Sequence, residues 1–292
     1  GAIVLSNVEN VAVRNVTVRD NSSFGFQVGN ARDFLIEGVV VDGTKDGVHL
    51  EGPAEMGVVR NVKGPLTGDD VVALNAWDWR TSSLTFGDIT DILVEDIEVD
   101  AGACAIRILP GIKLFPDGNT LACNVERCVF SDIRKCHTFK MYDQPNIRCV
   151  SDDYSADLGT VADLYFADIH VVPMDLTKHH DKSKCAVFDL CEHARGLHLE
   201  NITLDYLPGG AYPEYLISIG PKSSIRPIPF KKTGTQEIYN PNARPVARGV
   251  TVAGISTRSA DSPGELVRHE SPETLIYRAG PDPAGGGRQE AL

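Results

Sequence analysis

A short unit that recurs along the chain is the feature that most restricts its fold. Each copy alternates apolar and polar residues, is rich in β-branched side chains, and has an Asn, Asp or Gly near its middle. This pattern predicts two short strands joined by a turn. The copies are 10–18, 33–41, 91–99, 163–171 and, more weakly, 196–204.

A second short strand is expected after the units, and the spacing of the strands predicts how they are arranged. The intervals Val11 to Phe34 and Asp46 to Asp70 are 23 and 24 residues, near one turn of a parallel β-helix, and later intervals lengthen to about 33. Hairpin signals such as Asn-Gly are missing, which argues against a β-sandwich. We therefore predict an all-β fold, a right-handed parallel β-helix that forms a single-stranded solenoid. The expected second strands are 24–28, 47–50, 71–74, 105–109, 138–142, 185–190 and 214–219.

The predicted β-helix domain covers residues 1–259. Because each coil of a solenoid contacts only its neighbours, this length needs no second core. Residues 220–246 are expected to form a long loop, and the Pro- and Gly-rich residues 260–292 a loosely attached C-terminal tail. Native solenoids normally cap their open edge, and the chain starts inside a repeat, so we expect N-terminal coils or a cap before Gly1.

Charge and hydropathy exclude some classes of partner. The formal net charge of −12 argues against a general nucleic-acid binder, because such binding rests on basic surface. No apolar run approaches about 18 residues, so no membrane span is predicted. No signal peptide is visible in this sequence. The sequence does not predict an oligomeric state.

The cysteines leave two interpretations open. Their number, seven, is odd, so at least one is free or pairs between molecules. Their spacings match no zinc pattern, and we predict no metal site and no cofactor. They are either small buried residues on stacked strands or include one disulfide among Cys123, Cys128, Cys136 and Cys149. The remaining cysteines are Cys104, Cys185 and Cys191.

Three acidic residues stand just before two expected second strands that are one repeat apart. Asp46 precedes the strand 47–50, and Asp69 and Asp70 precede the strand 71–74. A lone Asp before Gly47 is explained by the turn. Stacking would bring all three carboxylates together, and packing like charges is costly unless a site uses them. Asp46, Asp69 and Asp70 are therefore the candidate catalytic residues.

Stacked second strands would also form rows of side chains, because alternate residues face the core. The expected inward rows are Val48, Val72, Ile106 and Phe139, and then Leu50, Leu74, Ile108 and Met141. The expected outward row between them is His49, Ala73, Arg107 and Lys140, extended by Gln27 and Asp189. A further outward row is Glu51, Asn75 and Tyr142. Acids, cations and aromatics would then line a groove suited to an extended polymer.

Trp77 and Trp79 flank Asp78 in the loop after the second acidic strand. An exposed pair would suit stacking on sugar faces, but the two rings could equally cover the coil. The candidate substrate-binding residues are therefore His49, Asn75, Arg107, Lys140, Tyr142, Trp77 and Trp79.

These residues resemble glycoside hydrolase family 28, the polygalacturonase-like enzymes of the pectin-lyase fold. The family's Asn-Thr-Asp signature is similar to Thr44-Lys45-Asp46, which keeps only the Asp, and its Gly-Asp-Asp signature is intact at Gly68-Asp69-Asp70. The similarity in repeat style covers about residues 1–220. The resemblance implies that Asp69 is the general acid, and that Asp46 and Asp70 hold and deprotonate the attacking water, giving inversion. It also implies a secreted or periplasmic protein.

Two motifs of the family differ here. Its Gly-His-Gly falls on Gly102-Ala103-Cys104, without the histidine, and its Arg-Ile-Lys falls on Thr138-Phe139-Lys140, without the arginine. Arg107, one coil earlier in the same row, could replace that charge. The changes affect substrate binding more than the acids. We therefore expect hydrolysis of a polysaccharide or oligosaccharide, pectin-like or another uronic-acid-containing glycan.

The implied mechanism has physical requirements. Inversion needs two carboxyl groups about 6.5–9.5 Å apart, which adjacent coils could supply. Crowding would keep Asp69 protonated near neutral pH, while Lys140 or Arg107 binds substrate. Two alternatives stay open. A polysaccharide lyase would use Lys140 or Arg107 as its base, with the aspartates on calcium, and a glycan-binding β-helix module would have no activity.

Overall fold

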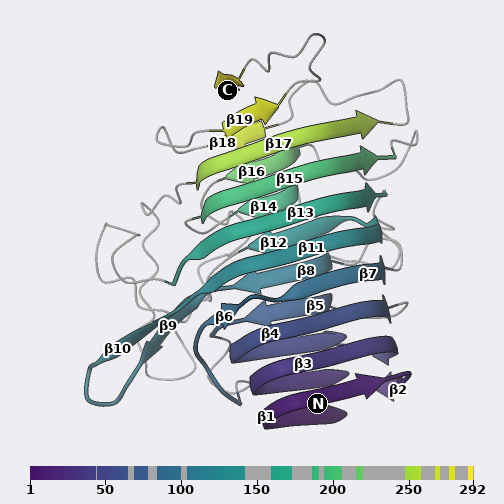
Figure 1. Ribbon diagram of the computed structural model, residues 1–292, viewed down its shortest axis with the longest axis vertical. Helices are drawn as coiled ribbons and strands as arrows, with labels where there is room; N and C mark the ends of the chain where they lie inside the picture. Colours follow the sequence, from purple (N-terminus) through teal and green to yellow (C-terminus); the bar gives the residue numbers. More distant parts are fainter. Residues whose placement is uncertain are drawn as a thin grey trace, which may run out of the picture.

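The protein is all-β in the parts that the structure describes. A computed structural model describes residues 1–43, 45–64, 69–77, 84–99, 104–141, 159–172, 186–190, 194–205, 215–219, 247–257, 267–269, 276–279 and 289–291. No helix occurs in these ranges, and the strands lie one above another from the N-terminus upward (Figure 1). The predicted all-β class is confirmed. Within the same ranges, no helix is long and apolar enough to cross a membrane.

The strands are of two kinds, long ones that bend and short ones beside the candidate site. They are β1 (Ile3–Arg14), β2 (Thr17–Asn21), β3 (Phe26–Gly43), β4 (Val48–Gly64), β5 (Asp70–Asn75), β6 (Ile89–Thr90), β7 (Leu93–Val99), β8 (Cys104–Leu109), β9 (Gly111–Leu114), β10 (Thr120–Cys123), β11 (Val125–Cys136), β12 (Thr138–Met141), β13 (Val161–Val171), β14 (Ala186–Leu190), β15 (Ala194–Leu204), β16 (Tyr215–Ile219), β17 (Ala247–Thr257), β18 (Val267–His269), β19 (Ile276–Ala279) and β20 (Gln289–Ala291).

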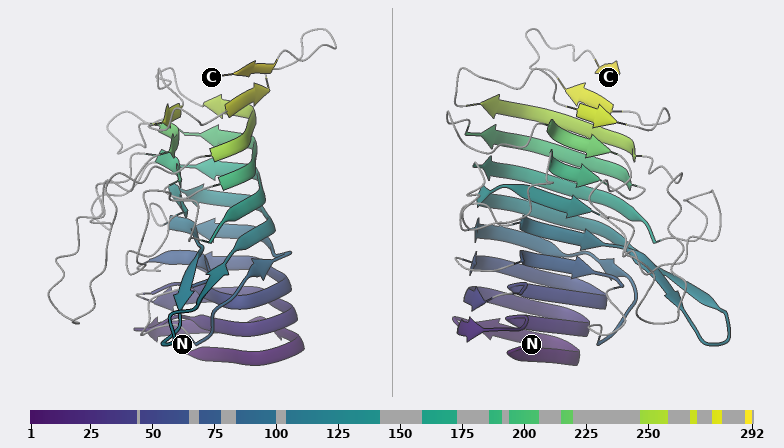
Figure 2. Two further views of the ribbon diagram at one scale, coloured as in Figure 1. Left: turned by 90° about the vertical axis from the view of Figure 1, so that its left-hand side faces the viewer. Right: turned by 180° about the vertical axis from the view of Figure 1, so that it is seen from behind.

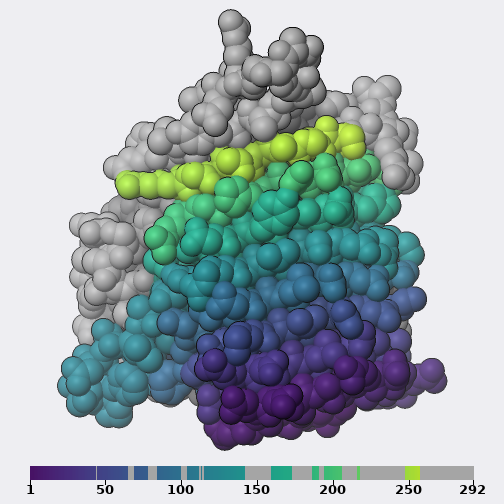
Figure 3. Space-filling model, in the orientation of Figure 1, coloured from purple at the N-terminus to yellow at the C-terminus, as the bar shows by residue number. Residues whose placement is uncertain are grey.

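Parallel pairing joins each coil to the next. The long strands pair in the order β1, β3, β4, β7, β11, β13, β15 and β17. The first residues of β4 pair with β5, which continues to β8, β12, β14 and β16. Two further views show the same stack, from which the antiparallel hairpin β9–β10 projects (Figure 2). In the space-filling view the coils form successive bands packed on each other (Figure 3).

Residues with left-handed backbone make the bends of the long strands. The expected bend near the middle of each unit has a positive φ in every copy, for example +57° at Asn15 and +54° at Asp96. Asn, Asp and Gly accept this conformation most readily. The whole set is Asn15, Gly38, Asn61, Asp96, Asp132, Asp168, Asn201 and Gly254. The strands are not interrupted there, so the expectation of two strands joined by a turn is wrong for most copies: one residue turns the chain while the flanking pairs stay in register.

A second set of left-handed residues lies five residues earlier in each coil. It comprises Asn10, Asp33, Met56, Asp91, Arg127, Asp163, Gly196 and Gly249. The register of the strands on either side places these residues above one another. The two sets give every coil the same two bends, and this keeps the stack straight enough for residues one coil apart to meet repeatedly.

The predicted rows of the short strands are confirmed by the register. Val48 pairs with Val72, Val72 with Ile106, and Ile106 with Phe139. The second inward row and the outward row from Gln27 to Asp189 pair in the same way. The inward side chains are fully buried. Stacked phenylalanine rings extend this core, with ring centroids 4.5 Å apart for Phe130 and Phe166 and 4.7 Å apart for Phe139 and Phe188; each such pair adds about 0.5–1.5 kcal/mol.

The C-terminal residues and the cysteines differ in part from expectation. β18 and β19 lie within the predicted tail, yet they pair in parallel with β16 and β17 and so continue the stack. Short apolar strands between prolines were too weak a pattern to recognise. Cys104, Cys123, Cys128 and Cys136 are free and buried, so no disulfide joins the last three to one another. Cys149, Cys185 and Cys191, and the loop 220–246, lie outside the described residues.

The bends give a test of the fold that is independent of function. Asn61 is exposed and has a φ of +52°. Asn61→Val should lower the free energy of unfolding by about 1–2 kcal/mol, because a β-branched residue is strained in the left-handed region. Asn61→Gly, the matched control, should change it by less than about 0.5 kcal/mol. Urea unfolding would measure both, and equal effects of the two changes would contradict the assigned bend.

Candidate active site

The three candidate aspartates meet at the head of two adjacent short strands. Asp46 lies in the turn before β4, Asp70 is the first residue of β5, and Asp69 directly precedes it. The backbone N–H of Gly47 donates to the carbonyl of Asp70 at 2.9 Å, which aligns the two turns. One carboxylate oxygen from each aspartate lies within 4.8 Å of those of the other two. The predicted convergence therefore occurs.

The three carboxyl groups differ in exposure. The side chains of Asp46 and Asp70 are fully buried, whereas that of Asp69 keeps 36% of its surface exposed. Asp69 is thus the member of the group that a bound molecule can touch directly.

Two cations from the next coils compensate the buried charge. Arg107 of β8 donates from Nη2 to Asp46 Oδ2 at 2.8 Å, and its Nε lies 3.1 Å from Asp70 Oδ2. Lys140 of β12 donates from Nζ to Asp70 Oδ1 at 3.2 Å and lies 3.9 Å from Asp69 Oδ1. The predicted outward row thus supplies both cations. Their guanidinium and ammonium groups are turned toward the aspartates.

Asp69 has a strongly altered acidity. Burial, and after it the neighbouring charges of Asp70 and Asp46, raise the pKa of its carboxyl group from 3.8 to about 6. Arg107 and Lys140 act in the opposite direction and lower this pKa. A carboxyl group with a pKa of about 6 is partly protonated close to neutral pH, which is the state that a general acid needs.

Two candidate substrate-binding residues of β4 and β5 do not face solvent, and Arg107 of β8 is only 7% exposed. His49 of β4 and Asn75 of β5 hold the predicted register, but both are fully buried. The expectation that they line an open groove is wrong. The ring of Phe24 stacks on His49, and Oε2 of Glu51, in the row beyond, accepts the backbone N–H groups of Leu84 and Thr85 at 2.5 and 3.0 Å. A later segment of the chain therefore covers this part of the strands.

The aromatic candidates have separate outcomes. Trp77 is 8% exposed and packs edge-on against Phe86, with the ammonium of Lys113 lying 4.3 Å from its ring centroid. Trp77 therefore covers the coil, which is one of the two interpretations of the tryptophan pair given above. Trp79 and Tyr142 lie outside the described residues. Phe24, whose ring stacks on His49, was not predicted as a site residue, and Glu51 was placed in the further outward row but not among the candidate site residues. The signal for Glu51 was its place two residues after His49, on the same side of the strand.

The donor set of the trio does not favour a metal ion. The three aspartates could each offer one oxygen. However, Arg107 and Lys140 already bind these oxygens, and a divalent cation would have to displace or face both positive charges. The charge of the trio is balanced by protein cations.

The spacing of the carboxyl groups differs from expectation. The oxygens within 4.8 Å of one another are closer than the gap of about 6.5–9.5 Å expected for inverting hydrolysis. One guanidinium, that of Arg107, contacts both Asp46 and Asp70, and Asp69 directly precedes Asp70 in the chain.

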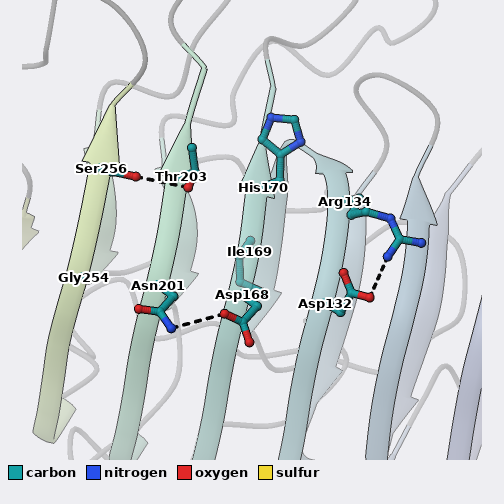
Figure 4. A pocket seen from close by; sticks show the side chains of 9 residues that line it. All are labelled: Asp132, Arg134, Asp168, Ile169, His170, Asn201, Thr203, Gly254 and Ser256. Atoms are coloured by element: carbon teal, nitrogen blue, oxygen red, sulfur yellow. Dashed lines mark hydrogen bonds and ion pairs between the residues drawn. The ribbon is translucent and has the colours of Figure 1, made fainter.

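A separate hollow lies on the outer face of the long strands. Its volume is about 400 Å³, and its lining comes from β11, β13, β15 and β17 (Figure 4). His170 here contacts Asp205 at 2.6 Å, and Asn201 donates to Asp168 at 3.2 Å. None of the candidate residues lines this hollow.

Comparisons with known proteins add little. No protein-family model matches the chain, and no curated protein matches its sequence. Among solved structures, the chain is similar to the catalytic domain of a GH87 alpha-1,3-glucanase in complex with nigerose, with 14% identity and a TM-score of 0.35. The match covers 91% of this chain and 49% of the other, so the chain spans about half the length of that protein.

The altered acidity of Asp69 predicts a pH-dependent effect on stability. The folded state holds the proton of Asp69 more tightly than the unfolded state, so stability falls as pH rises from 3.8 to about 6. Asp69→Asn removes this loss and should stabilise the protein more at pH 7 than at pH 4, by about 1 kcal/mol or less because the group is partly solvated. Thermal unfolding of wild type and variant at both pH values measures this.

The matched control is Asp33→Asn, an exposed aspartate on β3 with a left-handed backbone that Asn also accepts. Its effect should be the same at both pH values. If Asp69→Asn behaved identically to this control, the raised pKa would be contradicted.

Proposed function

We propose that the chain is a glycoside hydrolase built on a right-handed parallel β-helix of the pectin-lyase type, acting on a polysaccharide or oligosaccharide. The observation that carries the proposal is the convergence of three carboxyl groups of unequal exposure at one point of a stack of strands. Hydrolysis of a glycosidic bond uses one protonated and one ionised carboxyl group. The parallel register repeated from coil to coil supports the proposed fold.

Asp69 is the general acid in this proposal. Its carboxyl group is accessible, and its pKa of about 6 leaves a proton available for the leaving oxygen. Environments that separate the acidities of neighbouring carboxyl groups are a common basis for assigning acid and base. The burial of Asp69 beside two other carboxylates supplies that separation.

Asp70 and Asp46 hold and deprotonate the attacking water. Both are fully buried in ion pairs, so solvent reaches neither while the site is at rest. The water must enter beside Lys140, whose ammonium lies between Asp69 and Asp70 and is 16% exposed. Substrate hydroxyl or carboxylate groups would draw this ammonium outward and open the way. Lys140 is therefore the proposed substrate-binding cation, and Arg107 holds the acids in place.

The burial of Asp46 and Asp70 supports hydrolysis with inversion at the sugar carbon. The short separation of the carboxylate oxygens is nearer to the approximately 5–5.5 Å of retaining enzymes. A retaining enzyme, however, needs a carboxylate that attacks the sugar itself, and Asp46 and Asp70 are inaccessible to a sugar ring. A water molecule is small enough to enter where a sugar is not.

A lyase reaction has less support. Its base would be Lys140 or Arg107, and a base must be deprotonated to accept a proton. Both groups instead lie against carboxylates at 2.8 to 3.2 Å, which stabilises their charged forms.

The proposal is tested with a panel of plant and microbial glycans, including polygalacturonate and neutral polymers. Asp69→Asn and Asp70→Asn should each lower turnover by at least about 100-fold, because each removes a group that transfers or activates a proton. Asp33→Asn, on the exposed face of β3, should keep wild-type activity. New reducing ends and the absorbance of unsaturated products are measured together, with thermal unfolding to verify folding.

Reducing ends that depend on Asp69 and appear without absorbance would agree with the proposal. Unsaturated products would show a lyase, and full activity of either aspartate variant would reject the assigned roles. Wild-type protein that binds a glycan without cleaving it would indicate a binding module.

The proposed acid also sets the pH dependence of hydrolysis. Because Asp69 must be protonated and its pKa is about 6, kcat/KM should fall as pH rises above about 6. Lys140 lowers this pKa, so Lys140→Gln should move the decline to higher pH, whatever its effect on the maximum rate. Lys113→Gln, which removes a cation from the ring of Trp77, should not move it. A decline that stays in place in Lys140→Gln would contradict the role of Asp69.

A further inference from the structure

A layer of buried polar side chains lies behind the three aspartates. Gln27, His49, Glu51 and Asn75 come from β3, β4 and β5, and none is more than 6% exposed. Burying so many polar groups is costly unless each is hydrogen-bonded. Their partners therefore indicate what the layer does.

Glu51 is bound as a carboxylate. Its Oε2 accepts from the backbone N–H groups of Leu84 and Thr85, and its Oε1 accepts from Gln27 Nε2 at 3.0 Å. The same Oε1 lies 3.3 Å from His49 Nε2. Three N–H donors face the two oxygens, so Glu51 accepts hydrogen bonds at both of them.

Asp46 is bound as a carboxylate in the same way. Its Oδ2 lies 2.6 Å from His49 Nδ1 and accepts from Arg107 Nη2 at 2.8 Å. Its Oδ1 accepts from the backbone N–H of Asp70 at 3.4 Å. Each ring nitrogen of His49 therefore faces a carboxyl oxygen that accepts from other donors, Asp46 Oδ2 at Nδ1 and Glu51 Oε1 at Nε2. This arrangement suits an imidazolium at His49, with one acidic side chain at each ring nitrogen.

Neighbouring groups fix the ring of His49. The ring of Phe24 stacks on it, with centroids 4.0 Å apart and an angle of 18° between the planes. Asn75 Nδ2 is nearly equidistant from the two ring nitrogens, at 3.4 and 3.3 Å, so it lies over the ring and not in line with either nitrogen. The ring can neither flip nor leave its position without disturbing both neighbours.

We propose that His49 is a positioning residue for the hydrolysis proposed above, which holds Asp46 in its reactive orientation through a charged hydrogen bond backed by Glu51. Without His49, the side-chain contact that remains for Asp46 is Arg107, which is shared with Asp70. Asp46 could then rotate with that guanidinium. The inference rests on the proposed function of Asp46, while His49 itself is shielded from substrate.

Glu51 extends the same chain of contacts to the surface. Leu84, which it binds through the backbone, is 46% exposed, and Thr85 packs against Gly29, where an added Cβ would lie 2.4 Å from Thr85 Oγ1. The segment that covers the site is thus tied through Glu51 and His49 to Asp46.

Two matched variants separate positioning from packing. In His49→Asn, the amide nitrogen takes the place of Nδ1, the ring nitrogen that faces Asp46. In His49→Gln, the amide nitrogen takes the place of Nε2, the ring nitrogen that faces Glu51. His49→Gln should lower kcat about 10- to 100-fold with little change in KM, because a displaced catalytic group costs about that much. His49→Asn keeps a neutral bond to Asp46 and should stay within about 5-fold of wild type, since neutral bonds are roughly half as strong.

The rate on the best glycan is measured for both variants, together with their melting temperatures. Greater loss in His49→Gln at similar stability supports the proposal. Equal losses in the two variants, or losses that follow the melting temperature, would show a packing role and overturn it.

A measurement on wild-type protein tests the proposal even if the variants do not fold, and it does not require enzymatic activity. In wild-type protein, ¹⁵N NMR of labelled histidines should show one ring protonated on both nitrogens at pH 8, where ordinary histidines are neutral. Absence of that signal overturns the inference. If wild type hydrolyses nothing but shows the signal, the proposed function fails while the charge state of His49 holds. Hydrolysis that depends on Asp69 but not on His49 rejects the positioning role alone.

Discussion

The in-register stacking of parallel strands is the constraint on which the rest of the structure depends. Neighbouring strands lie about 4.8 Å apart, so equivalent residues of successive coils must meet. The two sets of left-handed residues keep each coil bent at the same positions, as Asn15 and Gly38 illustrate. Any charged residue placed at the head of a short strand therefore faces its counterpart one coil away. Asp46 and Asp70 meet for this reason, and Asp69 joins them because it directly precedes Asp70.

Charge compensation follows from this forced proximity. Four carboxylates, those of Asp46, Asp69, Asp70 and Glu51, lie in or beside the site, and three of them are fully buried. Buried carboxylates are tolerated only with hydrogen-bonded or charged partners. Arg107, Lys140 and His49 supply those partners, from the same outward row. Asp69 alone stays partly exposed, and its pKa is raised first by burial and then by repulsion from Asp70 and Asp46.

The sequence was sufficient to predict what depends on periodicity. Alternation along the short strands gave the rows from Val48 to Phe139 and from His49 to Lys140, because a period of two admits one register when one face is buried. It could not predict the cover over His49 and Asn75. The ring of Phe24 stacks on His49, and Leu84 and Thr85, which belong to an irregular segment without periodicity, reach Glu51 through backbone groups. For the same reason, the sequence did not predict that Glu51 binds this segment.

The most direct test is a crystal structure of Asp69→Asn soaked with an oligosaccharide from the glycan that wild-type protein cleaves. The account predicts that the sugar spans the short strands β5, β8 and β12, with a glycosidic oxygen within hydrogen-bonding distance of the residue 69 side chain and Lys140 turned toward the sugar. A sugar bound instead in the hollow beside His170 and Asp168, with the three aspartates unoccupied, would contradict it.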